Sequence, residues 1–225
     1  MKSYTNTTSG MKECNLNVSR RHFVASAGLT PVALGAAASI LAAKTAQAGV
    51  GDILENDNVL GDPKAPIGIV EYASLTCPHC AAFHNATLKK IEETYVKEGK
   101  AFVIYRDFPL DRYAFQASVL AHAAGKKKFF AVLSILFEKQ AEWTSAPDPT
   151  AALIAIGKRV GVSKSKFDAA LADEKLGESI LTDRLVGANE YGVRATPTIF
   201  VNGELYDGNR DFETMDSFFK GLIGS

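Results

Sequence analysis

Two cysteines separated by two residues are the part of this sequence best suited to chemistry. They belong to Cys77-Pro78-His79-Cys80, which lies between an apolar run and a segment with a helical pattern. A disulfide between residues so close in sequence closes almost no loop, so as a structural crosslink it would stabilise the fold very little. The spacing therefore favours a reactive dithiol over a structural staple.

The position of the motif at the start of a helix indicates a division of labour between the two thiols. Unpaired backbone N–H groups and the helix dipole favour a thiolate at Cys77. Pro78 suits a first helical turn, and His79 adds a partial positive charge nearby. Cys80 lies one turn further on, where its sulfur can attack a mixed disulfide formed at Cys77. We therefore predict a catalytic site made of these four residues.

A zinc site is the main alternative for a cysteine pair with this spacing. It would need Cys77, Cys80, His84 and a fourth ligand, and the sequence has no second cysteine pair to supply one. The dithiol hypothesis is therefore preferred, and no metal or other cofactor is expected beyond the cysteines themselves.

Glu71 is the one acidic residue in an otherwise apolar run six positions before Cys77. It is either an acid at the wet edge of a strand or a buried acid that moves protons for Cys80. His84 and Asp107 are assigned to the surface by default.

The elements around the motif alternate in a way that predicts an α/β fold. A buried strand at 66–73, a helix at 78–98 and a strand at 101–106 form a βαβ unit. Residues 111–191 contain helical patterns and no convincing strand. A hairpin around Asn202-Gly203 and a last helix that begins at Asp211 follow. This order, βαβ … ββα, predicts a four-stranded sheet with an inserted all-helical subdomain; residues 49–64 are expected to be a tail.

Taken together, Cys-Pro-His-Cys, the helical insertion and the later Thr196-Pro197 resemble the DsbA family of thiol-disulfide oxidoreductases, which have a thioredoxin-like fold. The resemblance assigns residues 49–110 to the first part of that fold, residues 111–191 to the inserted helical subdomain, and residues 192–225 to the last part of the fold. It implies that Cys77 is the attacking cysteine, that Cys80 is the buried resolving cysteine, and that Glu71 matches the family's proton-shuttling acid.

The same resemblance assigns a client-binding role to Thr196 and Pro197. It implies a cis peptide bond before Pro197, which would leave the Thr196 backbone free to pair with an incoming peptide. Thr196 differs from the valine of the best-known oxidases and is similar to the threonine of isomerase relatives. The resemblance also implies a membrane quinone-linked partner that reoxidises the dithiol.

The first 48 residues are predicted to be a twin-arginine signal peptide. Arg20 and Arg21 stand before a weakly hydrophobic run from Val24 to Ala43, and a small-x-small pattern ends at Ala48. Cleavage after Ala48 would release the protein into the periplasm, whereas the alternative is a retained membrane anchor.

These observations predict an exported dithiol oxidase that introduces disulfide bonds into reduced or unfolded client proteins and acts as a monomer. An isomerase or reductase of the same fold is the first alternative, and a peptide-binding chaperone with an incidental disulfide is the second. The formal net charge is zero and no basic stripe is present, so a nucleic-acid partner is not expected.

Overall fold

The structure is a computed structural model, and it describes residues 49–224. The predicted signal peptide and its cleavage site after Ala48 lie outside the described residues. Within residues 49–224, no helix is both long and apolar enough to cross a bilayer.

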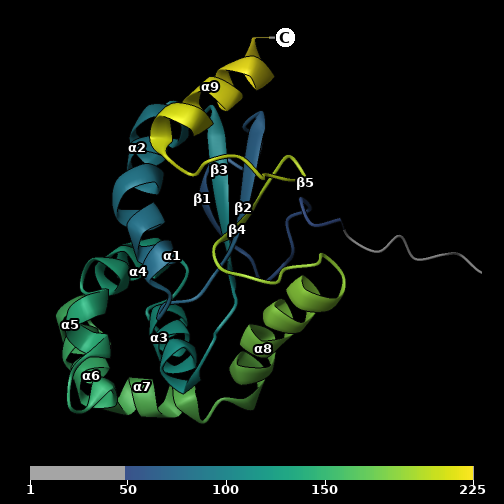
Figure 1. Ribbon diagram of the computed structural model, residues 1–225. Coiled ribbons are helices and arrows are strands. Elements are labelled where there is room, and N and C mark those ends of the chain that lie inside the picture. The colour runs from purple at the N-terminus through teal and green to yellow at the C-terminus, as the bar shows by residue number, and fades with distance from the viewer. Residues whose placement is uncertain (1–48, 225) are drawn as a thin grey trace, which may run out of the picture. The chain divides into compact units, whose positions relative to one another are not determined.

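A mixed sheet forms the centre of the fold (Figure 1). Its strands lie in the order β1-β3-β2-β4-β5, where β2 and β3 are parallel and the other neighbours are antiparallel. The strands are β1 (Asn58–Gly61), β2 (Ile67–Ala73), β3 (Ala101–Asp107), β4 (Thr198–Val201) and β5 (Glu204–Leu205). The predicted strand-helix-strand unit and the hairpin are confirmed, and β2 lies in the middle of the sheet.

The sheet has five strands among the described residues, so the prediction of four was wrong. The additional strand, β1, comes from the segment that was expected to be a tail, and it pairs antiparallel with β3. It contains four residues and only Val59 and Leu60 are large and apolar, which is too short for an alternating pattern to be recognised. Pairing with the outer edge of β3 stabilises it instead.

The predicted helix after the Cys-Pro-His-Cys motif is one continuous helical segment that ends at Val96. It comprises α1 (Pro78–Ala82), η1 (Phe83–Leu88), α2 (Lys89–Ile91) and η2 (Glu92–Val96), of which η1 and η2 have π-helical hydrogen bonding. Cys77 is the N-cap of α1, and Pro78 occupies the first turn. The start of the helix is therefore where the sequence predicted it.

The helical region between β3 and β4 is confirmed, and it contains six helices among the described residues. They are α3 (Arg112–Ala123), α4 (Phe129–Glu138), α5 (Gln140–Thr144), α6 (Pro149–Val160), α7 (Lys164–Leu171) and α8 (Glu174–Asn189). A break at Lys139 separates α4 from α5. Figure 1 shows α3 to α8 gathered below the sheet in that view.

The two faces of the sheet carry different residues, because successive side chains of a strand alternate between faces. On one face Ile67, Ile69 and Val103 pack against the helical segment 78–96 and against Met215 and Phe219 of α9 (Phe212–Ile223). On the other face Val70, Tyr72 and Ile104 pack against Val193 and Phe200. By this alternation, Glu71 shares the face that the active-site helix covers.

Candidate active site

Cys77 lies at the junction between the sheet and the helix that carries Cys80. Its backbone is extended, and its carbonyl accepts from Ala81 N–H at 3.1 Å, which begins α1. The amide of Gln140 donates to the carbonyl oxygens of Cys77 and Leu75, at 3.0 and 2.9 Å. A buried side chain of α5 thus fixes the loop that carries the first cysteine, a contact that the sequence did not predict.

The electrostatic environment favours a thiolate at Cys77. Burial acts to raise the pKa of this thiol, but hydrogen bonding with Thr196 and with the first turn of α1 outweighs it, so the pKa lies below that of an ordinary cysteine. The protonated thiol donates to the Thr196 carbonyl oxygen at 3.2 Å. The Thr196 hydroxyl is buried and has no partner among the described residues, so it is available to a thiolate.

Cys80 has the opposite environment. It is fully buried, and both thiols are free rather than joined in a disulfide. Burial raises the pKa of Cys80, and the nearby charge of Glu71 raises it further. The geometry therefore separates a thiol that ionises readily from one that keeps its proton.

Glu71 is a buried residue of the central strand, so the wet-edge alternative is excluded. It pairs in register with Tyr105 of β3 on one side and with Ile199 of β4 on the other. Its Oε2 lies 2.8 Å from Nε2 of His84, and its Oε1 is buried without a partner among the residues described. One carboxylate oxygen is therefore anchored, and the other is open.

The assignment of His84 to the surface was wrong, because its side chain is only 4% exposed. It lies four positions after Cys80 and four positions before Leu88, so it shares their buried face of the helix. That spacing was a usable signal, but histidine is also common on the exposed faces of helices.

A groove of about 450 Å³ lies beside the motif. The peptide bond between Thr196 and Pro197 is cis. The residues that line the groove come from the motif helix and from the segments on either side of the hairpin: His79, Ala82, Phe83, Thr87, Ala195, Thr196, Pro197 and Arg210. The structure thus brings His79 together with Thr196 and Pro197.

A second group of ionisable side chains lies away from the dithiol, where β3 meets the inserted helices. Asp107 was assigned to the surface, but it is 1% exposed, so that assignment was wrong. Its Oδ2 is 2.7 Å from His122 Nε2, and its backbone N–H donates to Asp183 at 3.3 Å. Its position at the end of a buried strand was the signal that sequence reasoning missed.

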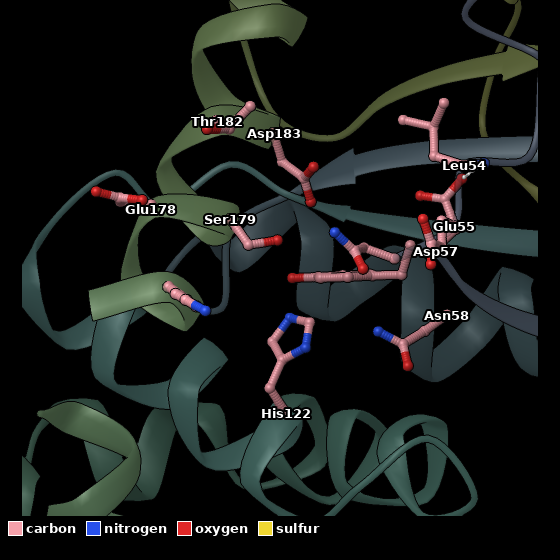
Figure 2. A pocket seen from close by; sticks show the side chains of 12 residues that line it. Leu54, Glu55, Asp57, Asn58, His122, Glu178, Ser179, Thr182 and Asp183 are labelled. Carbon is pink, nitrogen blue, oxygen red and sulfur yellow. Dashed lines mark hydrogen bonds between the residues drawn. The ribbon is translucent and has the colours of Figure 1, made fainter. Parts of the chain in front are cut away.

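Figure 2 shows His122 and Asp183 pointing into a pocket of about 380 Å³ from α3 and α8. Burial and the charge of Asp107 raise the pKa of Asp183 to about 7. Burial lowers the pKa of His122, but the hydrogen bond and charge of Asp107 raise it by more. These groups join β3 to two of the inserted helices.

The described part of the chain contains no group of three or more His, Cys, Asp or Glu residues with the geometry of a metal site.

Comparison with known proteins places this geometry in a family. The family model described as Thioredoxin matches residues 54–220. A curated relative from Rickettsia bellii, named as a protein-disulfide oxidoreductase, is 31% identical over 150 residues, which are 66% of this chain. The chain spans 58% of the length of that relative.

Solved structures agree with this placement. Alpha-DsbA1 of Wolbachia pipientis is 31% identical, with a TM-score of 0.72, over 76% of this chain and 93% of the other. BdbD of Bacillus subtilis shares the fold, with a TM-score of 0.68 at 19% identity, over 79% of this chain and 98% of the other. The chain therefore belongs to the thioredoxin family and, within it, to the DsbA-like thiol-disulfide oxidoreductases.

Proposed function

We propose that this protein is an exported dithiol oxidase that transfers the Cys77–Cys80 disulfide to reduced client proteins. The observation that carries the proposal is the contrast between the two thiols. Cys77 has a lowered pKa and contacts the cis-proline loop, whereas Cys80 is fully buried and its pKa is raised. A dithiol with one stabilised thiolate favours its reduced state and gives up its disulfide readily.

The reaction consists of two thiol-disulfide exchanges. A client thiolate attacks Cys77 Sγ, the Cys77–Cys80 bond breaks, and Cys80 leaves with the electron pair and takes a proton from Glu71. A second client thiolate then attacks the client sulfur of the mixed disulfide. The client disulfide forms, and Cys77 leaves as a thiolate that the first turn of α1 and the Thr196 hydroxyl stabilise.

The groove beside the motif is the proposed client site. A client segment would pair with the Thr196 backbone as an added strand and lie against Pro197 and Phe83. The two-electron oxidant is the disulfide itself, so no other cofactor is required. A membrane quinone-linked partner would restore the disulfide after each cycle, and export through the predicted signal peptide, cleaved after Ala48, would bring the monomeric protein to its clients in the periplasm.

A stoichiometric transfer experiment tests the proposal. The oxidised protein is mixed with a reduced, unfolded client that has several cysteines, and thiols are counted by alkylation and mass spectrometry. We expect one client disulfide for each molecule of oxidised protein consumed, and none from a Cys77→Ala/Cys80→Ala control. If the client keeps all its thiols, the oxidase function is wrong. Reactivation of a scrambled client by the reduced protein alone would make the protein an isomerase.

A further inference from the structure

The buried contact between Glu71 and His84 links two titratable groups beside the resolving cysteine. Their side chains are 0% and 4% exposed, and the two atoms in contact are 2.8 Å apart. A carboxylate and an imidazole at this distance can share one proton, and solvent does not compete for it. The two side chains therefore form a hydrogen-bonded pair that is shielded from solvent.

Aromatic side chains on two neighbouring elements hold the His84 ring in place. The ring stacks on Phe137 of α4, with centroids 4.0 Å apart and planes inclined by 27°. The Tyr105 ring meets it edge-on at 6.0 Å, and the side chain of Asn85 donates to the Phe137 carbonyl oxygen at 3.2 Å. The imidazole is thus fixed toward Glu71 between a strand and an inserted helix.

The titratable groups that face the pair are few. Cys80 lies on the same helical segment, and Glu71 acts on it as a nearby charge. Tyr105 is directly opposite Glu71 on β3, and burial keeps the pKa of its hydroxyl well above the ordinary value. Tyr105 therefore stays protonated, and Cys80 is the group with which the pair can exchange a proton.

We propose that His84 is a positioning residue that stores the proton Glu71 delivers to the Cys80 sulfur. The inference rests on the proposed oxidase function and extends it to a residue outside the Cys-Pro-His-Cys motif. It depends on the 2.8 Å contact, on the burial of both side chains, and on Glu71 Oε1, which has no partner within residues 49–224 and is free to serve Cys80.

The proton balance of the step is as follows. In the disulfide state the pair holds one shared proton and is neutral. When the client thiolate displaces Cys80, the leaving sulfur receives the electron pair of the broken bond and the proton of the pair. The pair is left as a Glu71 carboxylate that accepts a hydrogen bond from neutral His84. The negative charge thus moves from the sulfur to the hydrogen-bonded pair, and re-formation of the disulfide returns the proton.

Single-turnover kinetics over a range of pH test this role. The oxidised protein reacts with a reduced dithiol peptide, and formation of free Cys80 is followed by rapid quenching and alkylation. In His84→Asn the side chain can still donate a hydrogen bond but cannot hold the proton. We expect a loss of about tenfold or more near neutral pH and a changed pH profile. Glu71→Gln should cause a similar loss, and the double variant should lose little more.

Phe167→Leu is the matched control. It removes a buried ring of α7 and should lower the melting temperature, but it leaves the Glu71–His84 contact and the stacking of His84 on Phe137 in place, so its pH profile should follow the wild type. If His84→Asn also keeps the wild-type profile, the residue is structural and the proposal is overturned. If the wild type transfers no disulfide at all, the oxidase function fails instead, so the two failures are distinguishable.

A measurement on the unaltered protein covers the case in which His84→Asn does not fold. The imidazole resonances of His84 are recorded by NMR at fixed neutral pH in the disulfide and dithiol states. We expect them to differ, because the pair carries one proton fewer in the dithiol state. Identical His84 chemical shifts in the two states at that pH would overturn the proposal.

Discussion

Cys80→Ser is expected to trap client proteins as mixed disulfides at Cys77, while Cys77→Ser traps none. Without Cys80 the Cys77 thiolate can still form a disulfide with a client, but no internal thiol can release it. Turnover should fall by on the order of a thousandfold or more in either variant, the scale on which loss of a catalytic nucleophile acts. Non-reducing electrophoresis with antibody detection, in cells that express each variant, reports the trapped species.

Loss of activity does not distinguish the roles of the two cysteines, because both variants are inactive. The difference in the amount of trapped client does distinguish them. Cys77 contacts the cis-proline loop, and Cys80 is fully buried, so only the former can meet a client sulfur. The double variant, Cys77→Ser/Cys80→Ser, sets the background. Equal trapping by the two single variants would show that the roles are assigned wrongly.

Arg106→Leu is expected to cost the largest amount of stability of any single change considered, about 3–5 kcal/mol. The guanidinium is 1% exposed and binds Asp57, which is 4% exposed, at 2.9 Å. It also donates to the carbonyl oxygens of Val50 and Asp52, at 3.0 and 2.7 Å. Its loss leaves a buried carboxylate and two carbonyl groups without this hydrogen-bond donor. The Arg106 side chain is also what holds residues 50–57 against β3.

Denaturant unfolding followed by circular dichroism measures this loss. Lys90→Met is the control, because the Lys90–Glu213 pair is 53% and 74% exposed and should contribute about 1 kcal/mol or less. An equal, small effect of the two substitutions would contradict the role given to Arg106. Asp57→Leu added to Arg106→Leu should recover part of the loss, because it removes the unpaired charge.

The fold was predictable where it depends on local sequence patterns, above all at the first residues of helices and at the hairpin turn. Cys77 as N-cap, Pro78 in the first turn of α1 and Asp211 before α9 are all found where the sequence placed them. The hairpin turn at Asn202-Gly203 has positive φ at both residues, as that dipeptide indicates. These features depend on neighbours in sequence.

The features that were missed depend on partners distant in sequence. β1 exists because it pairs with β3, some forty residues later. His84 is buried because Glu71 and Phe137 meet it there, and Asp107 because His122 does. A single sequence does not reveal such partners, and a polar residue without a known partner is assigned to the surface by default. Correct assignment of His84 required the observation that Glu71 is buried.

We expect the dithiol to prefer its reduced state, because the pKa of the Cys77 thiol is lowered. A thiolate whose pKa is lower in the folded than in the unfolded protein stabilises the folded reduced form above the unfolded pKa. That stabilisation is lost as the pH falls through the folded pKa. The difference in unfolding free energy between the two redox forms equals the difference in reduction free energy between the folded and unfolded dithiol, so thermal stability reports the direction of transfer. His79→Ser should narrow the difference in melting temperature between the reduced and oxidised forms, because it removes a partial positive charge near Cys77.

Thermal melting of the oxidised and reduced forms, with and without dithiothreitol, is the most direct test that this protein donates disulfides. We predict that the reduced form melts at the higher temperature near pH 7, and that the gap widens as the pH rises toward about 8.5, the pKa of an ordinary thiol. A higher melting temperature for the oxidised form would contradict the account, because such a disulfide would be a poor oxidant and the protein would act as a reductase.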